Sequence, residues 1–257
     1  MKFLFAIALL VPTAAIAAGP FDGTWKTQLD SIQFSNRPDV YMLKQGIYKC
    51  SSCVPAYSVK ADGTDQKVGG HSYYDTVAVN VVDARTVQVA VKLGGKPSYS
   101  NSMSVSADGA TLTETFQDMS GAQTVTGTQV SKRVAAGAPG SHAISGSWKT
   151  EKMPDISDVG ATVTYKMTSD GLQMGWNGQS YDAKFDGKKY LTANDPGKTW
   201  VSLRRISDST IEETDSRDGK VVDVYRMTVS ADGKTMTVVD KDVRRGTTSQ
   251  YKMLKQP

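Results

Sequence analysis

The sequence contains two copies of one unit, and this repeat constrains the fold more than any other feature. Residues 23–27 read Gly-Thr-Trp-Lys-Thr, and residues 146–150 read Gly-Ser-Trp-Lys-Thr, 123 positions later. Residues 103–109 and 227–233 share Met, Val, Ser, Ala, Asp and Gly at an offset of 124. Two matches in the same order, with registers that differ by one residue, indicate a tandem duplication.

A stretch of small residues with Pro and Gly, at 135–143, separates the copies and is typical of a linker. We therefore expect one domain at 18–134 and a second at 144–257.

Both copies have the pattern of β-strands. Apolar residues alternate with more polar ones over 86–93 in the first copy and over 161–167 in the second, which is the period of a strand with one buried face. Asp-Gly pairs between such runs favour tight hairpins. About eight runs per copy predict an all-β fold of two tandem antiparallel up-and-down β-barrels, because closing a meander into a barrel removes its exposed edges.

The N-terminus has the features of an export signal. Lys2 precedes an apolar run from Phe3 to Val11, and small residues end at Ala17. This pattern predicts a signal peptide at 1–17, and no later segment has the roughly 20 apolar residues of a transmembrane helix. We expect a soluble exported protein, periplasmic or extracellular. Its net charge of +4 is spread among acidic residues without a basic cluster, so we expect no nucleic-acid partner.

Cys50 and Cys53 are the only cysteines, and in an oxidising compartment we expect them to form a disulfide with each other. The same spacing is found in redox-active disulfides and in zinc sites. A redox pair usually begins a helix, whereas the residues here indicate a strand that turns back. Zinc usually has four ligands, and the chain offers only His71 and His142 besides the cysteines. We therefore favour a structural disulfide and expect no metal and no other cofactor.

Aromatic residues are concentrated around this cysteine pair. Tyr48, Tyr57, His71, Tyr73 and Tyr74 are our candidates for ligand binding, because they could line a cavity. The alternative is that they fill the barrel or cover its outer surface, where aromatic residues are also common. The second copy lacks the cysteines, so we expect any specific site in the first copy.

Motifs of catalysis are absent from the sequence, and we expect no catalytic residues. His71 has Ser72 and Asp75 near it, but adjacent strand residues point to opposite faces. For the same reason we interpret Glu212-Glu213 as a solvated strand edge.

The Gly-x-Trp start of each copy, together with an Asp-Gly-Lys hairpin and the Val-Ser-Ala-Asp-Gly-Lys-Thr segment at 229–235, resembles small exported bacterial lipocalin-like (calycin) proteins. The resemblance covers both copies. It implies barrels with a possible internal ligand site and assigns no catalytic residues. It also implies a structural role for Trp25 and Trp148, with a cation from Lys132-Arg133 or Lys255 over each ring.

These observations favour a non-enzymatic binding protein of the cell envelope that holds a small apolar or amphipathic ligand in a barrel. Two alternatives remain open. One is a structural or interaction module that contacts another envelope protein. The other is a thiol-disulfide active protein that uses Cys50 and Cys53.

Overall fold

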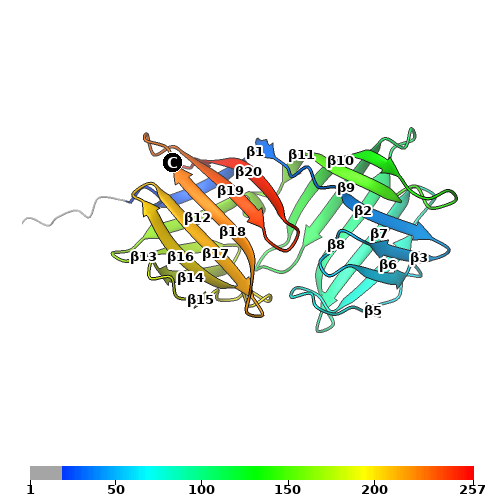
Figure 1. The fold of residues 1–257 in the computed structure, drawn as a ribbon, viewed down its shortest axis with the longest axis horizontal. Coiled ribbons are helices and arrows are strands. Elements are labelled where there is room, and N and C mark those ends of the chain that lie inside the picture. The colour runs from blue at the N-terminus through cyan, green and yellow to red at the C-terminus, as the bar shows by residue number, and fades with distance from the viewer. Residues whose placement is uncertain (1–18) are drawn as a thin grey trace, which may run out of the picture.

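The computed structural model describes residues 19–257, which form antiparallel β-strands and one short helix. The strands make two ten-stranded sheets, and each sheet curls into a nearly closed barrel (Figure 1). The predicted all-β fold of two tandem barrels is confirmed. The strand number exceeds the expected eight because each copy also contains very short strands, such as β5 (Gln66–Lys67) and β15 (Tyr190–Leu191). The signal peptide predicted at 1–17 lies outside the described residues.

Neighbouring strands in each sheet are consecutive in the chain except around one strand, which is β11 (Gly146–Ile156) in the first sheet and β1 (Gly23–Gln33) in the second. From edge to edge, the first sheet contains β4 (Tyr57–Lys60), β3 (Ile47–Cys50), β2 (Asp39–Lys44), β11, β10 (Val125–Ala136), β9 (Thr111–Asp118), β8 (Lys96–Val105), β7 (Thr86–Leu93), β6 (Thr76–Val81) and β5. The second contains β14 (Gln179–Lys184), β13 (Gly171–Trp176), β12 (Thr162–Met167), β1, β20 (Thr247–Lys255), β19 (Thr235–Asp242), β18 (Lys220–Val229), β17 (Thr210–Arg217), β16 (Trp200–Ser207) and β15.

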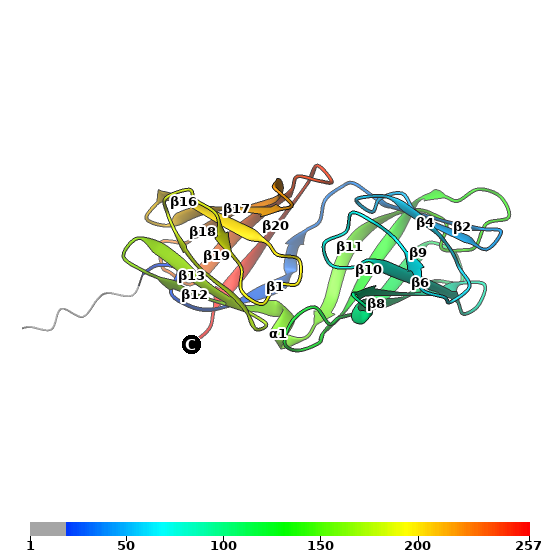
Figure 2. The same ribbon diagram turned by 90° about the horizontal axis from the view of Figure 1, so that it is seen from below.

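The two copies exchange their first strands. β11 begins the second copy, yet it lies between β2 and β10 of the first, where Trp148 is opposite Asp39 and Arg133. β1 lies in the equivalent place between β12 and β20 of the second copy. Figures 1 and 2 show the blue β1 among the yellow-to-red strands, and the light-green β11 beside the green β10 in the other barrel. Each barrel therefore combines nine strands of one copy with the first strand of the other, and the sheets depart from the sequence bounds 18–134 and 144–257 at these strands.

The hydrophobic cores follow the same exchange. Trp148 is fully buried among residues of the first copy, and Trp25 is fully buried among residues of the second. Each indole N–H donates to a backbone carbonyl four residues earlier, at 2.8 Å. The Arg133 guanidinium lies 4.0 Å from the Trp148 ring centre, and the Lys255 ammonium lies 5.5 Å from that of Trp25. The tryptophans of the repeated motif thus lie at the centres of the two cores.

Two segments carry the chain between the barrels. Residues 34–38 connect β1 to β2, and α1 (Asp158–Ala161) connects β11 to β12. Among residues 19–257, no helix is long and apolar enough to cross a membrane.

A hairpin of the second copy also contacts the first barrel. At the β13–β14 turn, the carbonyl and side chain of Asn177 accept hydrogen bonds from the backbone of Ala122 and Gln123, each at 2.9 Å. Gly121 allows this approach, because a Cβ there would lie 2.2 Å from the Asn177 amide nitrogen. The hairpin is thereby held against the end of the first barrel.

Candidate functional site

The first barrel contains a cavity of about 420 Å³ lined mainly by aromatic and aliphatic side chains. Tyr48, Tyr57, Tyr73 and Tyr74, four of the five residues predicted for ligand binding, line it. The apolar floor is made by inward-facing residues of β7 and β8, which alternate with outward-facing polar ones. A cavity of this size lies in the range of small-molecule sites in proteins.

The tyrosines form a continuous aromatic wall. Tyr41 stacks on Tyr48 with ring centres 6.1 Å apart, Tyr48 lies 6.2 Å from Tyr57, and Tyr57 meets Tyr74 edge-on at 6.5 Å. Burial raises the pKa of all four, and that of Tyr74 reaches about 12. Their hydroxyls are therefore neutral at physiological pH and can donate or accept hydrogen bonds.

Glu114 supplies a buried carboxyl to this cavity, and Asp118 also lines it. The Tyr99 hydroxyl donates to the Glu114 carboxyl oxygen Oε1 at 2.7 Å, and the Asn101 amide donates to the same oxygen at 2.6 Å. Burial raises the pKa of Glu114, and these two hydrogen bonds oppose the shift. The cavity thus combines a large apolar surface with a polar cluster at Glu114, which suits an amphipathic ligand.

His71 is the predicted site residue that the cavity does not include. Its ring stacks on Tyr74 with centres 4.2 Å apart and meets Tyr57 edge-on at 5.8 Å. It lines a neighbouring surface hollow together with Cys50 and Arg244. Burial lowers the pKa of His71, and the positive charge of Arg244 lowers it further. His71 therefore supports the aromatic wall from behind as a neutral ring.

Cys50 and Cys53 form the expected disulfide. Cys50 ends β3, where it is paired with Tyr41 on one side and with Tyr57 on the other. Its side chain is buried, and Cys53 reaches the cavity. The bond therefore ties the loop after β3 to the part of the sheet that carries the tyrosines.

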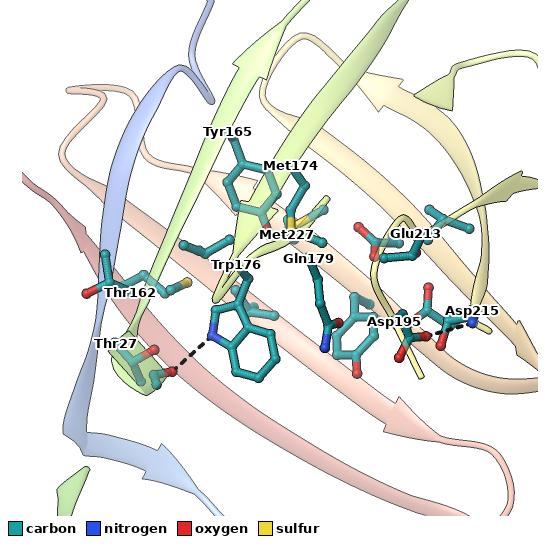
Figure 3. Close-up of a pocket in the computed structure, with 18 of the residues that line it drawn as sticks. Thr27, Thr162, Tyr165, Met174, Trp176, Gln179, Asp195, Glu213, Asp215 and Met227 are labelled. Carbon is teal, nitrogen blue, oxygen red and sulfur yellow. Dashed lines mark hydrogen bonds between the residues drawn. The ribbon is translucent and has the colours of Figure 1, made fainter. Parts of the chain in front are cut away.

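The second barrel contains a cavity of about 410 Å³ with a different character (Figure 3). Glu213 and Asp215 of β17 and Asp195 lie on one side, and Tyr165, Trp176 and the sulfur-bearing Met174 lie across from them. The interpretation of Glu212-Glu213 as a solvated edge is wrong for Glu213, which is only 8% exposed. Glu212 points outward and forms an ion pair with Arg204 at 2.7 Å.

The two buried carboxyls of β17 are held close to each other. The Tyr181 hydroxyl donates to Glu213 Oε2 at 2.6 Å, and Glu213 and Asp215 are close enough that each carboxyl affects the pKa of the other. Burial raises the pKa of both, and the charge of Glu213, followed by that of Asp223, raises the pKa of Asp215 further, against the opposing effect of Arg217. Two acids so close together in an apolar wall retain a proton more readily than either would alone.

The two cavities adjoin each other. Tyr73 of the first copy and Trp176 and Gln179 of the second line both. The Tyr73 hydroxyl is 3.4 Å from Thr199 Oγ1, and its ring lies under the Arg217 guanidinium at 4.9 Å. The loop of the second copy leaves room for this ring because residue 197 is Gly, where a Cβ would lie 2.5 Å from the ring.

Comparison with protein-family models and comparison with curated protein sequences each found no match to this chain. The geometry of the two cavities is therefore what supports a function.

Proposed function

We propose that this chain is an exported, non-enzymatic binding protein of the cell envelope that holds a small amphipathic ligand in the first barrel. The observation that carries the proposal is the cavity of about 420 Å³ behind the tyrosine wall. Apolar rings would contact the body of the ligand, and the cluster at Glu114 would pair with a hydroxyl or amide on it. The architecture of two tandem barrels agrees with the lipocalin-like resemblance, which we retain as part of the proposal.

Export is supported by the sequence at 1–17 and by the Cys50–Cys53 disulfide, a bond that persists in oxidising compartments. Native mass spectrometry of protein purified from its own envelope tests both parts of the proposal. We expect a mature chain that begins after Ala17 and carries a co-purifying small molecule. A full-length chain found in the cytoplasm would contradict the export proposal.

A neutral fluorescent probe, N-phenyl-1-naphthylamine, tests the cavity directly. Val91 lines it and is 6% exposed, so Val91→Phe would place a ring in the space that the ligand needs. Val81, in the neighbouring strand β6, is 40% exposed, and Val81→Phe is the matched control. We expect saturable binding to the unmodified protein and to the control, and a loss of about tenfold or more in Val91→Phe, or roughly 1.4 kcal/mol. Equal affinity in all three proteins would refute the proposed location.

A further inference from the structure

We propose that the second barrel is a separate binding site for a small organic ammonium ion, whose nitrogen would lie beside Glu213 and Asp215 and whose apolar part would lie against the aromatic wall. The inference goes beyond the function proposed above, because it concerns another cavity and another class of ligand. Either proposal can fail without the other.

The duplication shows that the fold does not need acids at these positions. At the offset of 124 residues, Glu213 and Asp215 correspond to Val89 and Val91 of the first copy. Both valines are buried, in the strand β7 that matches β17 in length. Burying a carboxyl costs free energy that a valine does not. The second copy therefore carries a destabilising pair where the same scaffold packs well with apolar residues, which is typical of a functional site.

The pair lacks a partner of opposite charge. Asp215 is 9% exposed, lines the cavity, and its buried Oδ1 has no hydrogen-bond donor in the described part of the chain. The positive charge of Arg217 acts on Asp215, but its Nε donates to Thr199 Oγ1 at 2.8 Å and its Nη2 lies 3.7 Å from Asp223. No ion pair within residues 19–257 involves Glu213 or Asp215. An ammonium ion in the cavity would supply the missing charge and the missing donors.

The rest of the cavity favours an organic cation over a metal ion. Its remaining wall includes rings that attract cations through their faces and thioether side chains that fill irregular apolar space: Tyr165, Tyr225, Tyr251, Trp176, Met174, Met227 and Met253. Hard metal ions such as Ca²⁺ take six to eight oxygen ligands, and within residues 19–257 no group of three or more His, Cys, Asp or Glu side chains is arranged to hold a metal ion. A volume of about 410 Å³ accommodates an amine with a ring or a short alkyl chain.

Binding would depend on pH through the two acids. The groups that face or surround them are Arg217, Asp195, Asp223, Asp240 and the hydroxyls of Tyr165, Tyr181, Tyr225 and Tyr251. Burial raises the pKa of Glu213 and Asp215, so in acid both are neutral and attract a cation weakly. As the pH rises through their raised pKa values, the affinity for an ammonium ion increases, as long as the amine itself keeps its proton.

The test compares benzylamine with its neutral isostere benzyl alcohol and with benzoate, by isothermal titration calorimetry of the full chain. We expect saturable benzylamine binding that is about tenfold or more tighter than that of benzyl alcohol, no binding of benzoate, and weaker benzylamine binding near pH 4 than near pH 8. Equal affinity for the amine and the alcohol would overturn the proposal. So would no benzylamine binding up to about 1 mM, or displacement of benzylamine by CaCl₂ at lower concentration.

The variant Glu213→Val with Asp215→Val restores the residues of the first copy and is expected to fold, because the first barrel packs with them. We expect it to lose benzylamine binding while it still binds N-phenyl-1-naphthylamine in the first barrel. Glu212→Gln is the matched control, since this carboxyl lies on the same strand but points outward. It should bind benzylamine as the unmodified protein does. Unchanged binding in the double variant, or an equal loss in the control, would refute the site.

Discussion

Trp148→Ala should destabilise the barrel of the first copy although the residue belongs to the second. The side chain is fully buried in the core that β2–β10 form, and its indole N–H donates to the Ile144 carbonyl at 2.8 Å. The Arg133 guanidinium, 4.0 Å from the ring centre, covers it from one side. The substitution removes the largest side chain of that core and leaves Arg133 without its aromatic partner.

The expected cost follows from this burial. Truncating a buried Phe or Trp to Ala typically costs about 3–5 kcal/mol, and the zero exposure of Trp148 places it toward the upper part of that range. Domains are stable by about 5–15 kcal/mol, so the loss is a large share of the stability of one barrel. At roughly 1.4 kcal/mol per factor of ten, amides that exchange through opening of this barrel should lose about a thousandfold of protection.

Hydrogen exchange measured by mass spectrometry reports the stability of each barrel separately, because peptides from the two barrels are distinguished. For Trp148→Ala we expect the loss of protection in peptides from β2 to β11, with β12–β20 close to the unmodified protein. Trp25→Ala is the mirror control and should expose β1 and β12–β20 instead. If Trp148→Ala deprotected β12–β20 and spared β2–β10, each copy would keep its own first strand and the exchange would be refuted. Equal loss in both barrels would refute the independence of the two cores.

Three further outcomes are expected. Asp215→Asn should raise the unfolding temperature more near pH 8 than near pH 4, because burial raises the pKa of Asp215 in the folded chain. Above the ordinary pKa of an aspartate, the unfolded chain releases a proton that the folded chain retains, so the unmodified protein loses stability as the pH rises. Tyr99→Phe removes one of two donors to Glu114, which should raise the pKa of that carboxyl further and cost about 1–3 kcal/mol in urea unfolding at neutral pH; no change in the urea midpoint would contradict the buried hydrogen bond. Replacing Cys50 and Cys53 by Ser should cost about 2 kcal/mol or less, because the loop they close is short, and should weaken N-phenyl-1-naphthylamine binding; unchanged probe binding would show that the disulfide does not organise the tyrosine wall.

The repeat and the alternation of apolar residues were sufficient to predict two all-β barrels, because both follow from local patterns. The exchange of first strands could not be predicted in this way. β1 and β11 begin with nearly the same five residues, and each offers a buried Trp, so either strand satisfies either sheet. What differs between the two arrangements is the path of the connections at 34–38 and at α1, and periodicity carries no information about that path.

The candidate sites, like the fold, could be predicted only in part from local sequence patterns. The aromatic residues that crowd the first copy include four tyrosines that line the first cavity and His71, whose ring packs behind the wall. Their role in ligand binding stays a prediction. Glu213 departs from the prediction because neighbouring strand residues face opposite sides: Glu212 points outward to Arg204, whereas Glu213 is 8% exposed. Aligning the copies at 124 would have placed Glu213 on Val89, an inward position of an alternating strand. Comparing the two copies position by position is therefore more informative about function than reading either one alone.

The exchange also bears on how two different cavities come to adjoin. Each barrel has its own core, so one copy could keep valines at the positions where the other acquired carboxyls without loss of the common scaffold. The chain crosses between the barrels twice because of the exchanged strands. Contacts at the β13–β14 turn and at Tyr73 hold the adjoining ends of the two barrels together. Tyr73 and Trp176 are consequently part of both walls. A ligand that moves either ring in one cavity changes the shape of the other, and thermodynamic linkage requires that any resulting effect on affinity be equal in both directions.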